Sequence, residues 1–380
     1  MHIIIAPNAF KHSLSAFAVA DAIKAGFEKS GLPATYAVYP IADGGEGITD
    51  ILVRHLKGQF RATTVQDALG RNIKSYFGLI NNKKTAVIEL ANASGSRWLQ
   101  PNEFNPELAS TYGTGQLILN ALNLGIRDFI IGLGNSATVD GGTGLLQALG
   151  IKFFDDRNQP LALGAKALGK LATIDVSGLD PRLSECTITV ACDVENVLLG
   201  ATGAARVFGP QKGANAAMVD DLERYLTNLN EVVKKYLGKD MAFLKYGGAA
   251  GGTATALATF LEAKLVSGIH YLSDLTHFSA ALPSADLLVT AEGGLDNQTL
   301  AGKGPYGIAQ LAQKHNVPVI VLAGQIPDNL DLSKFTCFDA VFPIGTGPVS
   351  LAQALAYTTE NLNRTAWQIG NLLKLGLTAK

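Results

Sequence analysis

Acidic residues and lysines recur beside glycines in several short segments of the chain. Lys11 follows the first apolar run, Asp43 lies within Ala42-Asp-Gly-Gly-Glu-Gly47, and Asp193 follows the apolar run 187–192. A carboxylate placed directly after a buried strand can serve as a general base or a metal ligand. A lysine in such a loop is well placed to bind an anion. Taken singly, each of these residues also fits a plain solvated side chain.

Two glycine-rich segments have the composition of phosphate cradles. Residues 132–142 follow one apolar run, and residues 247–252 lead into a helical pattern that begins at Thr253. Backbone N–H groups at a glycine-rich helix start bind anions. If they do not bind phosphate, residues 132–142 would serve tight strand–helix packing and residues 247–252 would be a flexible linker. The candidate nucleotide-binding residues are Gly134, Asn135, Ser136, Thr138, Asp140, Gly141, Gly142, Gly251, Gly252 and Lys303.

A third segment combines acids, a hydroxyl and a lysine within fourteen residues. Glu292, Asp296, Thr299 and Lys303 all follow the apolar run 286–290. This set is typical of a metal-plus-phosphate site. It is not a P-loop, because Gly304 occupies the position after the lysine where that motif requires Ser or Thr.

Together these segments predict phosphoryl transfer, which needs bound phosphates, Mg²⁺ on carboxylates, cations on the developing charge and an acid that accepts a proton. Segment 132–142 also fits a dinucleotide fingerprint, with Asp155 on the next strand, so an NAD-dependent dehydrogenase is one alternative. The Gly141-Gly142 pair argues against it, since it would cost that helix about 2 kcal/mol. A non-enzymatic two-domain binding protein is a second alternative.

Composition limits the classes of partner. The 380 residues carry a net charge of −1, which excludes nucleic-acid binding by bulk positive charge. The three cysteines form no C-x-x-C pair, so a structural zinc site is not expected. No apolar stretch reaches the roughly 18 residues that a membrane span needs. The beginning of the chain does not resemble a signal peptide, and we therefore expect a cytoplasmic protein without membrane partners.

Short β-branched runs alternate with helical patterns, which predicts an α/β fold. We expect an outer domain of residues 1–60 plus 270–380, with an inserted α/β domain of residues 61–269. Ligands are expected at the carboxyl ends of strands and in the crevice between domains. The predicted outer strands are 2–6, 35–40, 286–290, 317–323 and 337–343, with helices 15–31, 305–315 and 349–375. The predicted inner strands are 85–90, 128–133, 151–154 and 187–191, with helices 114–124 and 215–237.

The chain resembles the bacterial glycerate kinases of the large two-domain type, which phosphorylate D-glycerate with ATP. The similarity runs essentially from end to end. The residues that carry it are Ile5–Lys11, Ala42–Gly47, Thr111–Gly115, Gly134–Gly142, Ala191–Val194, Phe208–Ala214, Gly248–Gly252 and Glu292 to Lys303.

The resemblance implies a Rossmann-like outer domain, a flavodoxin-like inserted domain, ATP with Mg²⁺, and D-glycerate converted to 2-phosphoglycerate. A homodimer fits the same resemblance. A kinase for another small hydroxy acid, or one that forms 3-phosphoglycerate, is the closest alternative. The implied catalytic residues are Asp43, Asp193 and Lys11; the substrate-binding residues are Lys212, Ser13 and Gly45; the metal ligands are Asp193, Glu292 and Asp296. Which of Asp43 and Asp193 is the base stays open.

Two departures from the family pattern bear on function. The family commonly has Asp where this chain has Asn8, so we assign Asn8 no proton-transfer role. It commonly has Gly where this chain has Asn135. Asparagine tolerates a left-handed φ better than most residues, and we therefore expect the loop to keep its shape.

Overall fold

The computed structural model describes residues 1–42, 45, 47–192, 194–295, 299 and 304–378. The chain forms two compact units: an outer unit of Met1–Asp43 with Ile269–Lys380, and an inserted unit of Gly44–Gly268. The expected α/β class is confirmed. The first boundary lies near residue 43 instead of residue 60, because helix α2 (Ile48–His55) packs on the sheet of the inserted unit. A Cβ added at Gly78 would lie 2.5 Å from Cγ2 of Val53 in that helix.

The outer unit contains a five-stranded parallel sheet in the order β13-β12-β11-β1-β2. Counted along the unit, this is the flavodoxin-like order 2-1-3-4-5, and it corrects the expected Rossmann order. The reason is that β1 pairs with β2 on one side and with β11 on the other, so the chain changes direction across the sheet at β1. The strands are β1 (His2–Ile5), β2 (Thr35–Val38), β11 (Leu287–Glu292), β12 (Val319–Ala323) and β13 (Ala340–Pro343).

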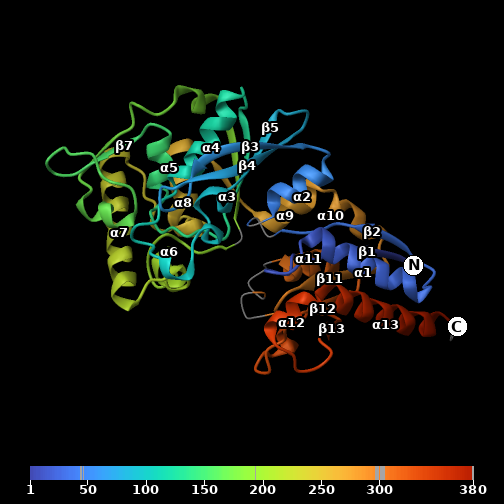
Figure 1. Cartoon of the computed structure of the whole chain (residues 1–380). Coiled ribbons are helices and arrows are strands. Elements are labelled where there is room, and N and C mark those ends of the chain that lie inside the picture. The colour runs from blue at the N-terminus through green and yellow to red at the C-terminus, as the bar shows by residue number, and fades with distance from the viewer. Residues whose placement is uncertain (43–44, 46, 193, 296–298, 300–303, 379–380) are drawn as a thin grey trace. The chain divides into compact units, whose positions relative to one another are not determined.

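Helices cover both faces of this sheet (Figure 1). Ile3 and Ile5 pack on one face with α1 (Ala16–Ser30) and α13 (Thr358–Thr378), whereas Ile4 packs on the other face with α11 (Gly304–Gln313). This alternation follows from the two-residue period of a strand. Because both faces are covered, the strands read as continuous apolar runs.

The ends of α1 lie where the sequence predicts them. The Ser15 side chain accepts a hydrogen bond from the Ala18 N–H, and the helix ends at Gly31 with φ 67°. The single helix expected over 349–375 is instead two helices, α12 (Leu351–Ala356) and α13, because the chain leaves helical geometry at Tyr357. The remaining helices of this unit are α9 (Gly268–Leu275) and α10 (Phe278–Ala281).

The inserted unit contains a six-stranded mixed sheet in the order β10-β9-β6-β5-β4-β3. It is not flavodoxin-like, because β3, β4 and β5 form an antiparallel meander that the sequence analysis did not predict. The remaining three strands, β6, β9 and β10, pair in parallel with one another, and β6 pairs in parallel with β5. The strands are β3 (Gln59–Gln66), β4 (Asn72–Ile80), β5 (Thr85–Glu89), β6 (Asp128–Gly132), β9 (Thr187–Cys192) and β10 (Lys264–Ser267). The predicted strand 151–154 forms a separate hairpin as β7 (Lys152–Phe154) with β8 (Thr173–Asp175).

A large apolar core lies within the inserted unit, and a smaller apolar cluster forms around Ala68, Leu99, Ala109 and Ala137. The longest helix is capped at both ends, by the Asn215 side chain and by Gly238 with φ 66°. The helices of this unit are α2, α3 (Ala91–Ser94), α4 (Tyr112–Asn123), α5 (Thr143–Ala148), α6 (Ala204–Phe208), α7 (Ala216–Leu237) and α8 (Ala249–Leu261).

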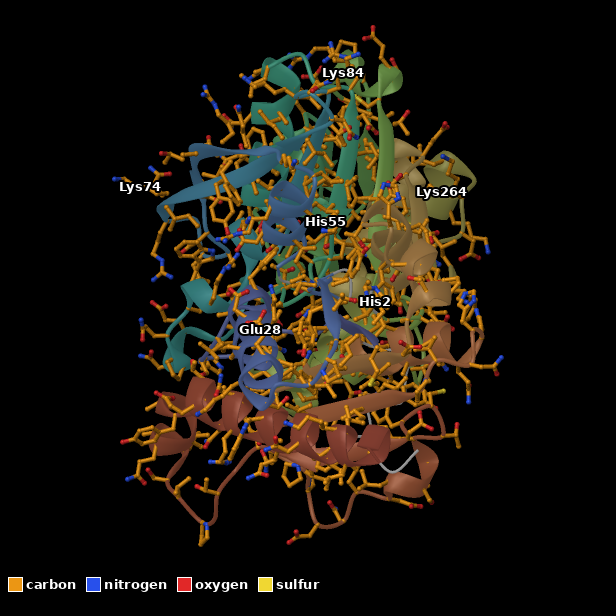
Figure 2. The ribbon with its side chains drawn as sticks, turned by 90° about the vertical axis from the view of Figure 1, so that its right-hand side faces the viewer. His2, Glu28, His55, Lys74, Lys84 and Lys264 are labelled. Carbon is orange, nitrogen blue, oxygen red and sulfur yellow. The ribbon has the colours of Figure 1, made fainter. Side chains whose placement is uncertain are left out.

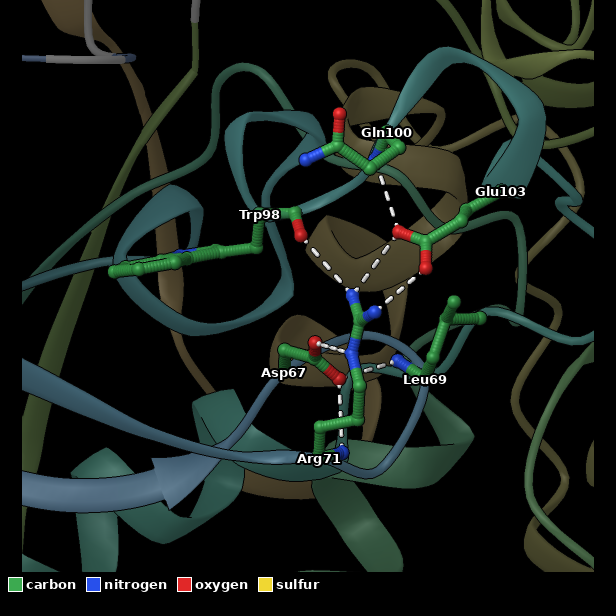
Figure 3. Close-up of polar contacts among 6 residues, drawn as sticks. All are labelled: Asp67, Leu69, Arg71, Trp98, Gln100 and Glu103. Carbon is green, nitrogen blue, oxygen red and sulfur yellow. Dashed lines mark hydrogen bonds and ion pairs between the residues drawn. The ribbon is translucent and has the colours of Figure 1, made fainter.

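A buried carboxylate and an arginine join the β3–β4 turn to residues 98–103 (Figure 3). Asp67 accepts hydrogen bonds from the backbone N–H groups of Leu69 and Arg71 at 2.9 Å, and from Nε of Arg71 at 2.6 Å. The same guanidinium donates to Glu103 at 2.6 Å and to the Trp98 carbonyl at 3.0 Å. This Arg71 clamp fixes the segment that follows α3.

Lysines at the periphery of the inserted unit are solvated. Lys74, Lys84 and Lys264 are exposed, and their side chains point away from the ribbon (Figure 2). None of the helices in the described part of the chain is long and apolar enough to span a membrane.

Candidate functional site

In the outer unit, the loops after β1 and β11 lie side by side at the carboxyl edge of the sheet. The Asn8 N–H donates to the Ala291 carbonyl at 2.8 Å, which extends the pairing beyond the strands. A Cβ added at Gly293 would lie 3.7 Å from the backbone nitrogen of Lys11. The change of direction at β1 is the place where open α/β sheets bind ligands. The structure thus brings Lys11 and Glu292 to one edge.

The side chains at this edge differ in how they are held. Lys11 is exposed, whereas Glu292 is half-buried and accepts a hydrogen bond from the Thr299 hydroxyl at 3.4 Å. The Ser13 hydroxyl lies 2.8 Å from both the Leu355 carbonyl oxygen and the Thr358 hydroxyl. Ser13 therefore ties the loop after β1 to the junction of α12 and α13, and its contact with substrate stays a prediction.

Four predicted site residues lie outside the described residues: Asp43, Asp193, Asp296 and Lys303. Their roles therefore stay predictions. Gly45 is described and is buried.

In the inserted unit, Lys212 lies against the loop that follows β6. Lys212 ends a short 3₁₀ helix (Pro210–Lys212) and is only 4% exposed. Its Nζ donates to the Ser136 hydroxyl at 2.8 Å and to the Thr138 carbonyl oxygen at 2.7 Å. A buried ammonium needs such acceptors, because removing an unpaired charge from water is costly. The structure thereby joins a predicted substrate-binding lysine to the predicted nucleotide loop.

Thr138 offers a further group at this place. Its side chain is fully buried, and its hydroxyl oxygen has no hydrogen-bond partner within the part of the chain that the structure describes. A buried hydroxyl without a partner costs about 1–3 kcal/mol. The loop therefore holds one polar group that an incoming ligand or water can satisfy.

The glycines of the two cradle segments pack against each other. Gly251, with φ 66°, accepts a hydrogen bond from the Gly141 N–H at 3.0 Å, and a Cβ added to it would lie 2.1 Å from the Thr138 carbonyl oxygen. Added Cβ atoms at Gly142 and Gly252 would likewise lie within 3 Å of protein atoms. This backbone approach explains why glycine is required at these positions. Contact of these glycines with a nucleotide stays a prediction.

Asp140 is fully buried and acts as an internal acceptor. Its Oδ2 accepts hydrogen bonds from the Thr111 N–H and hydroxyl, both at 2.8 Å, and from the Gly144 N–H at 3.2 Å. Its Oδ1 accepts from the Gly142 N–H at 3.1 Å. Burial raises the pKa of Asp140, and these donors oppose that rise. Asp140 thus holds the starts of α4 and α5 together.

Asn135 has φ 50°, so the structure confirms that asparagine takes the left-handed conformation expected of it. Its carbonyl oxygen accepts a hydrogen bond from the Ser96 N–H at 3.0 Å, and Gly95 forms a β-bridge with Ser136. The loops after β5 and β6 therefore lie side by side at the carboxyl edge of the inserted sheet.

Glu89 is a residue that the sequence analysis missed. It is the last residue of β5 and is 2% exposed. Burial raises the pKa of Glu89 to about 7, against the opposing effects of a hydrogen bond from the Thr49 N–H and the charge of Arg97. The signal in the sequence was an acid at the end of an apolar run, the same pattern that selected Asp193.

Binding of Mg²⁺ stays a prediction, and the described residues supply part of the oxygen donors that such a site needs. No three His, Cys, Asp or Glu side chains cluster as metal ligands among the described residues. Mg²⁺ usually takes only one or two carboxylates and binds substrate phosphates and water with the rest of its shell. The Glu292 carboxylate with the adjacent Thr299 hydroxyl supplies oxygen donors of the kind that this ion prefers.

Comparison with known proteins gives matches over the whole chain. Residues 3–374 match the model of the glycerate kinase family. A glycerate kinase of Bacillus subtilis (strain 168) is 42% identical over 378 residues, which cover 100% of this chain and 99% of the relative. The glycerate 2-kinase of Escherichia coli (strain K12) is 41% identical, with 99% of each chain covered. A crystal structure assigned as a glycerate kinase 2 from Salmonella typhimurium LT2 is 42% identical, has a TM-score of 0.84 and covers 100% of this chain and 99% of its own.

Proposed function

The chain belongs to the glycerate kinase family, and from that premise we propose that it transfers the γ-phosphate of ATP to the C2 hydroxyl of D-glycerate, giving 2-phosphoglycerate. The structural observation that best supports this proposal is the hydrogen bonding of buried Lys212 to Ser136 and Thr138. This contact holds a fixed cation on the glycine- and hydroxyl-rich loop that follows β6, in the parallel part of the mixed sheet. Fixed cations of this kind stabilise phosphate charge during phosphoryl transfer.

Several side chains share the proposed reaction. Lys212, with the Ser136 hydroxyl beside it, stabilises charge on the transferred phosphoryl group. Lys11 binds the carboxylate of glycerate or a phosphate oxygen. Asp43 or Asp193 accepts the proton of the attacking hydroxyl. This base must lie within hydrogen-bond reach of that hydroxyl. The attacking hydroxyl oxygen must in turn lie about 3–3.5 Å from the γ-phosphorus.

Mg²⁺ is proposed to bind at Glu292, with Asp193 and Asp296 as further candidate ligands. When bound, the ion neutralises charge on the β- and γ-phosphates. The contribution of this chain is to hold Glu292 at the end of β11, where the Gly324 N–H fixes its carbonyl oxygen at 3.0 Å.

The family resemblance favours the C2 hydroxyl, and placement explains why one pocket should use only one of the two hydroxyls. A cation that holds the carboxylate lies one carbon from the C2 hydroxyl and two carbons from the C3 hydroxyl. Attack through C3 would therefore shift the reacting oxygen by over about 1 Å, which spoils the alignment on which the rate depends. A single preformed pocket gives a single product. The name of the Escherichia coli relative, glycerate 2-kinase, agrees with attack through C2.

The test couples the reaction to enolase without phosphoglycerate mutase. Immediate formation of phosphoenolpyruvate supports the 2-phosphate product. Complete consumption of ATP, with phosphoenolpyruvate formed only after mutase is added, would identify a 3-kinase. A parallel panel of other small hydroxy acids tests the substrate, since a higher kcat/KM for another acid would replace D-glycerate. The homodimer and the cytoplasmic location expected from the sequence stay predictions.

A further inference from the structure

The start of helix α8 contains a turn of unusual backbone conformation. Ala250, Gly251 and Gly252 have φ values of 50°, 66° and 94°, so three successive residues adopt the left-handed conformation. Alanine rarely adopts it, because its Cβ comes too close to the following carbonyl oxygen. Strained backbone of this kind persists only where the surrounding structure holds it, and it is concentrated at functional sites. We call residues 250–252 the left-handed turn.

Two hydrogen bonds hold the left-handed turn in place within the inserted unit. The hydroxyl of Thr253 donates to the Ala250 carbonyl oxygen at 2.8 Å, and the N–H of Gly141 donates to the Gly251 carbonyl oxygen at 3.0 Å. Thr253 is fully buried, so bulk water cannot replace its hydroxyl. A Cβ added at Gly252 would lie 3.0 Å from Cα of Gly141. The left-handed turn is therefore packed tightly against the loop that follows β6.

The carbonyl oxygen of Thr138, in this loop, contacts both Lys212 and the left-handed turn. It accepts a hydrogen bond from Nζ of Lys212 at 2.7 Å. The backbone of Gly251 is so near that an added Cβ would lie 2.1 Å from the same oxygen. A displacement of the carbonyl by about 1 Å away from Nζ would lengthen this hydrogen bond beyond the usual range. The left-handed turn thus limits where the acceptor of Lys212 can lie.

The ammonium of Lys212 depends on this acceptor for its position. Lys212 is only 4% exposed, and the Ser136 hydroxyl and the Thr138 carbonyl oxygen both accept hydrogen bonds from its Nζ. Bulk water therefore cannot take over the role of a displaced carbonyl. Stabilisation of developing charge is strong only where the donor is already in place, and a misplacement of about 1 Å can lower the rate about 100-fold.

We propose that Gly251 is a positioning residue: through the Thr138 carbonyl oxygen it holds the ammonium of Lys212 where that ammonium stabilises phosphate charge. The proposal rests on the proposed function, because Lys212 has this task only if the protein transfers a phosphoryl group. It also gives Gly251 a different role from that of a phosphate cradle. A cradle glycine would bind phosphate with its own N–H, whereas Gly251 acts through Lys212.

The test is a double-mutant cycle between Gly251→Ala and Lys212→Ala, with kcat/KM for D-glycerate and ATP as the readout. Substitutions that act through one group have non-additive effects, whereas independent effects multiply. Gly238→Ala is the matched control: its φ is also 66° and it lies in the same unit, but no atom lies within 4 Å of the added Cβ. All variants are measured well below their thermal midpoints, so that unfolding does not contribute.

Gly251→Ala alone should lower kcat/KM by about 10- to 100-fold. Added to Lys212→Ala, it should change kcat/KM by less than about threefold, because the group through which it acts is already absent. Gly238→Ala should have an effect below about threefold in either background. The proposal is overturned if Gly251→Ala alone stays within about threefold of wild type, or if it lowers the kcat/KM of Lys212→Ala by more than about threefold.

Failure of the proposed function gives a different result. Wild type would then not phosphorylate D-glycerate, or Lys212→Ala would lose no activity, and the positioning role would fall with it. Should Gly251→Ala not fold, Thr253→Val takes its place in the cycle. Valine retains the size of the buried threonine but removes the hydroxyl that binds the Ala250 carbonyl oxygen. It should lower kcat/KM about 10-fold in wild type and less than about threefold in Lys212→Ala, and equal losses in both would overturn the proposal.

Discussion

The ammonium of Lys212 is buried and lies 2.7 Å from the carbonyl oxygen of Thr138. This contact connects a turn after α6 to the glycine loop after β6, two segments that are 74 residues apart in the chain. Under the proposed function, the charge of Lys212 needs no reorganisation when the phosphate binds, which is the condition for strong electrostatic stabilisation.

Lys212→Ala should lower kcat/KM by about 10²- to 10³-fold, the scale of losing one preorganised charge-stabilising donor. Steady-state kinetics with D-glycerate and ATP measure the effect. Lys74→Ala is the control, because Lys74 is exposed on β4 and should leave kcat/KM unchanged. A Lys212→Ala enzyme within threefold of wild type would limit this lysine to a structural role.

Gly251→Ala should destabilise the inserted unit by about 2–4 kcal/mol. The added Cβ would lie 2.1 Å from the Thr138 carbonyl oxygen, so backbone must move in addition to the left-handed strain at φ 66°. Gly238→Ala is a matched control: it has the same φ of 66°, but no atom lies within 4 Å of the added Cβ. It should cost only about 1–2 kcal/mol. If urea unfolding shows that both variants lose the same free energy of unfolding, the contact with Thr138 contributes nothing to the effect of Gly251→Ala.

The raised pKa of Glu89, about 7 against an ordinary 4.5, gives a defined pH dependence of stability. A carboxyl whose pKa is raised in the folded state contributes stability that is present below about pH 4.5 and is lost as the pH rises through 7. The free energy of unfolding of wild type, minus that of Glu89→Gln, should therefore fall by about 3 kcal/mol between pH 4.5 and 8. Urea unfolding at several pH values measures this difference. A difference that is flat or rises with pH would contradict the buried, raised carboxyl.

Activity should require Mg²⁺ or Mn²⁺, because the charge on the β- and γ-phosphates needs neutralising. Glu292→Gln should raise the Mg²⁺ concentration needed for half-maximal activity. Glu231→Gln, at an exposed position on α7, should not change it. Titration of Mg²⁺ at saturating ATP measures both. Full turnover in excess chelator would end the assignment of a metal.

The sequence alone predicted the elements whose signals are local. Apolar runs such as 2–6 and 187–191 became buried strands, and Ser15 with Gly31 marked the ends of α1, because period, cap and left-handed turn depend on neighbouring residues. The left-handed conformation at Asn135 could be predicted because asparagine tolerates a positive φ better than most residues. The segments that carry chemistry were selected for the same reason, since acids, lysines and glycines beside a strand end are visible without a fold.

The tertiary structure decided which of these segments meet. Strand order could not be predicted from the sequence. The strands β1 and β11 pair through residues such as Ile4 and Leu288, which are nearly 300 positions apart, and hydrophobic periodicity contains no information about which distant strands pair. The same holds for Glu89, which accepts the N–H of Thr49 in a distant helix. Residue type and spacing fix what a side chain can do, whereas burial and the approach of distant backbone determine which side chains are held in place to do it.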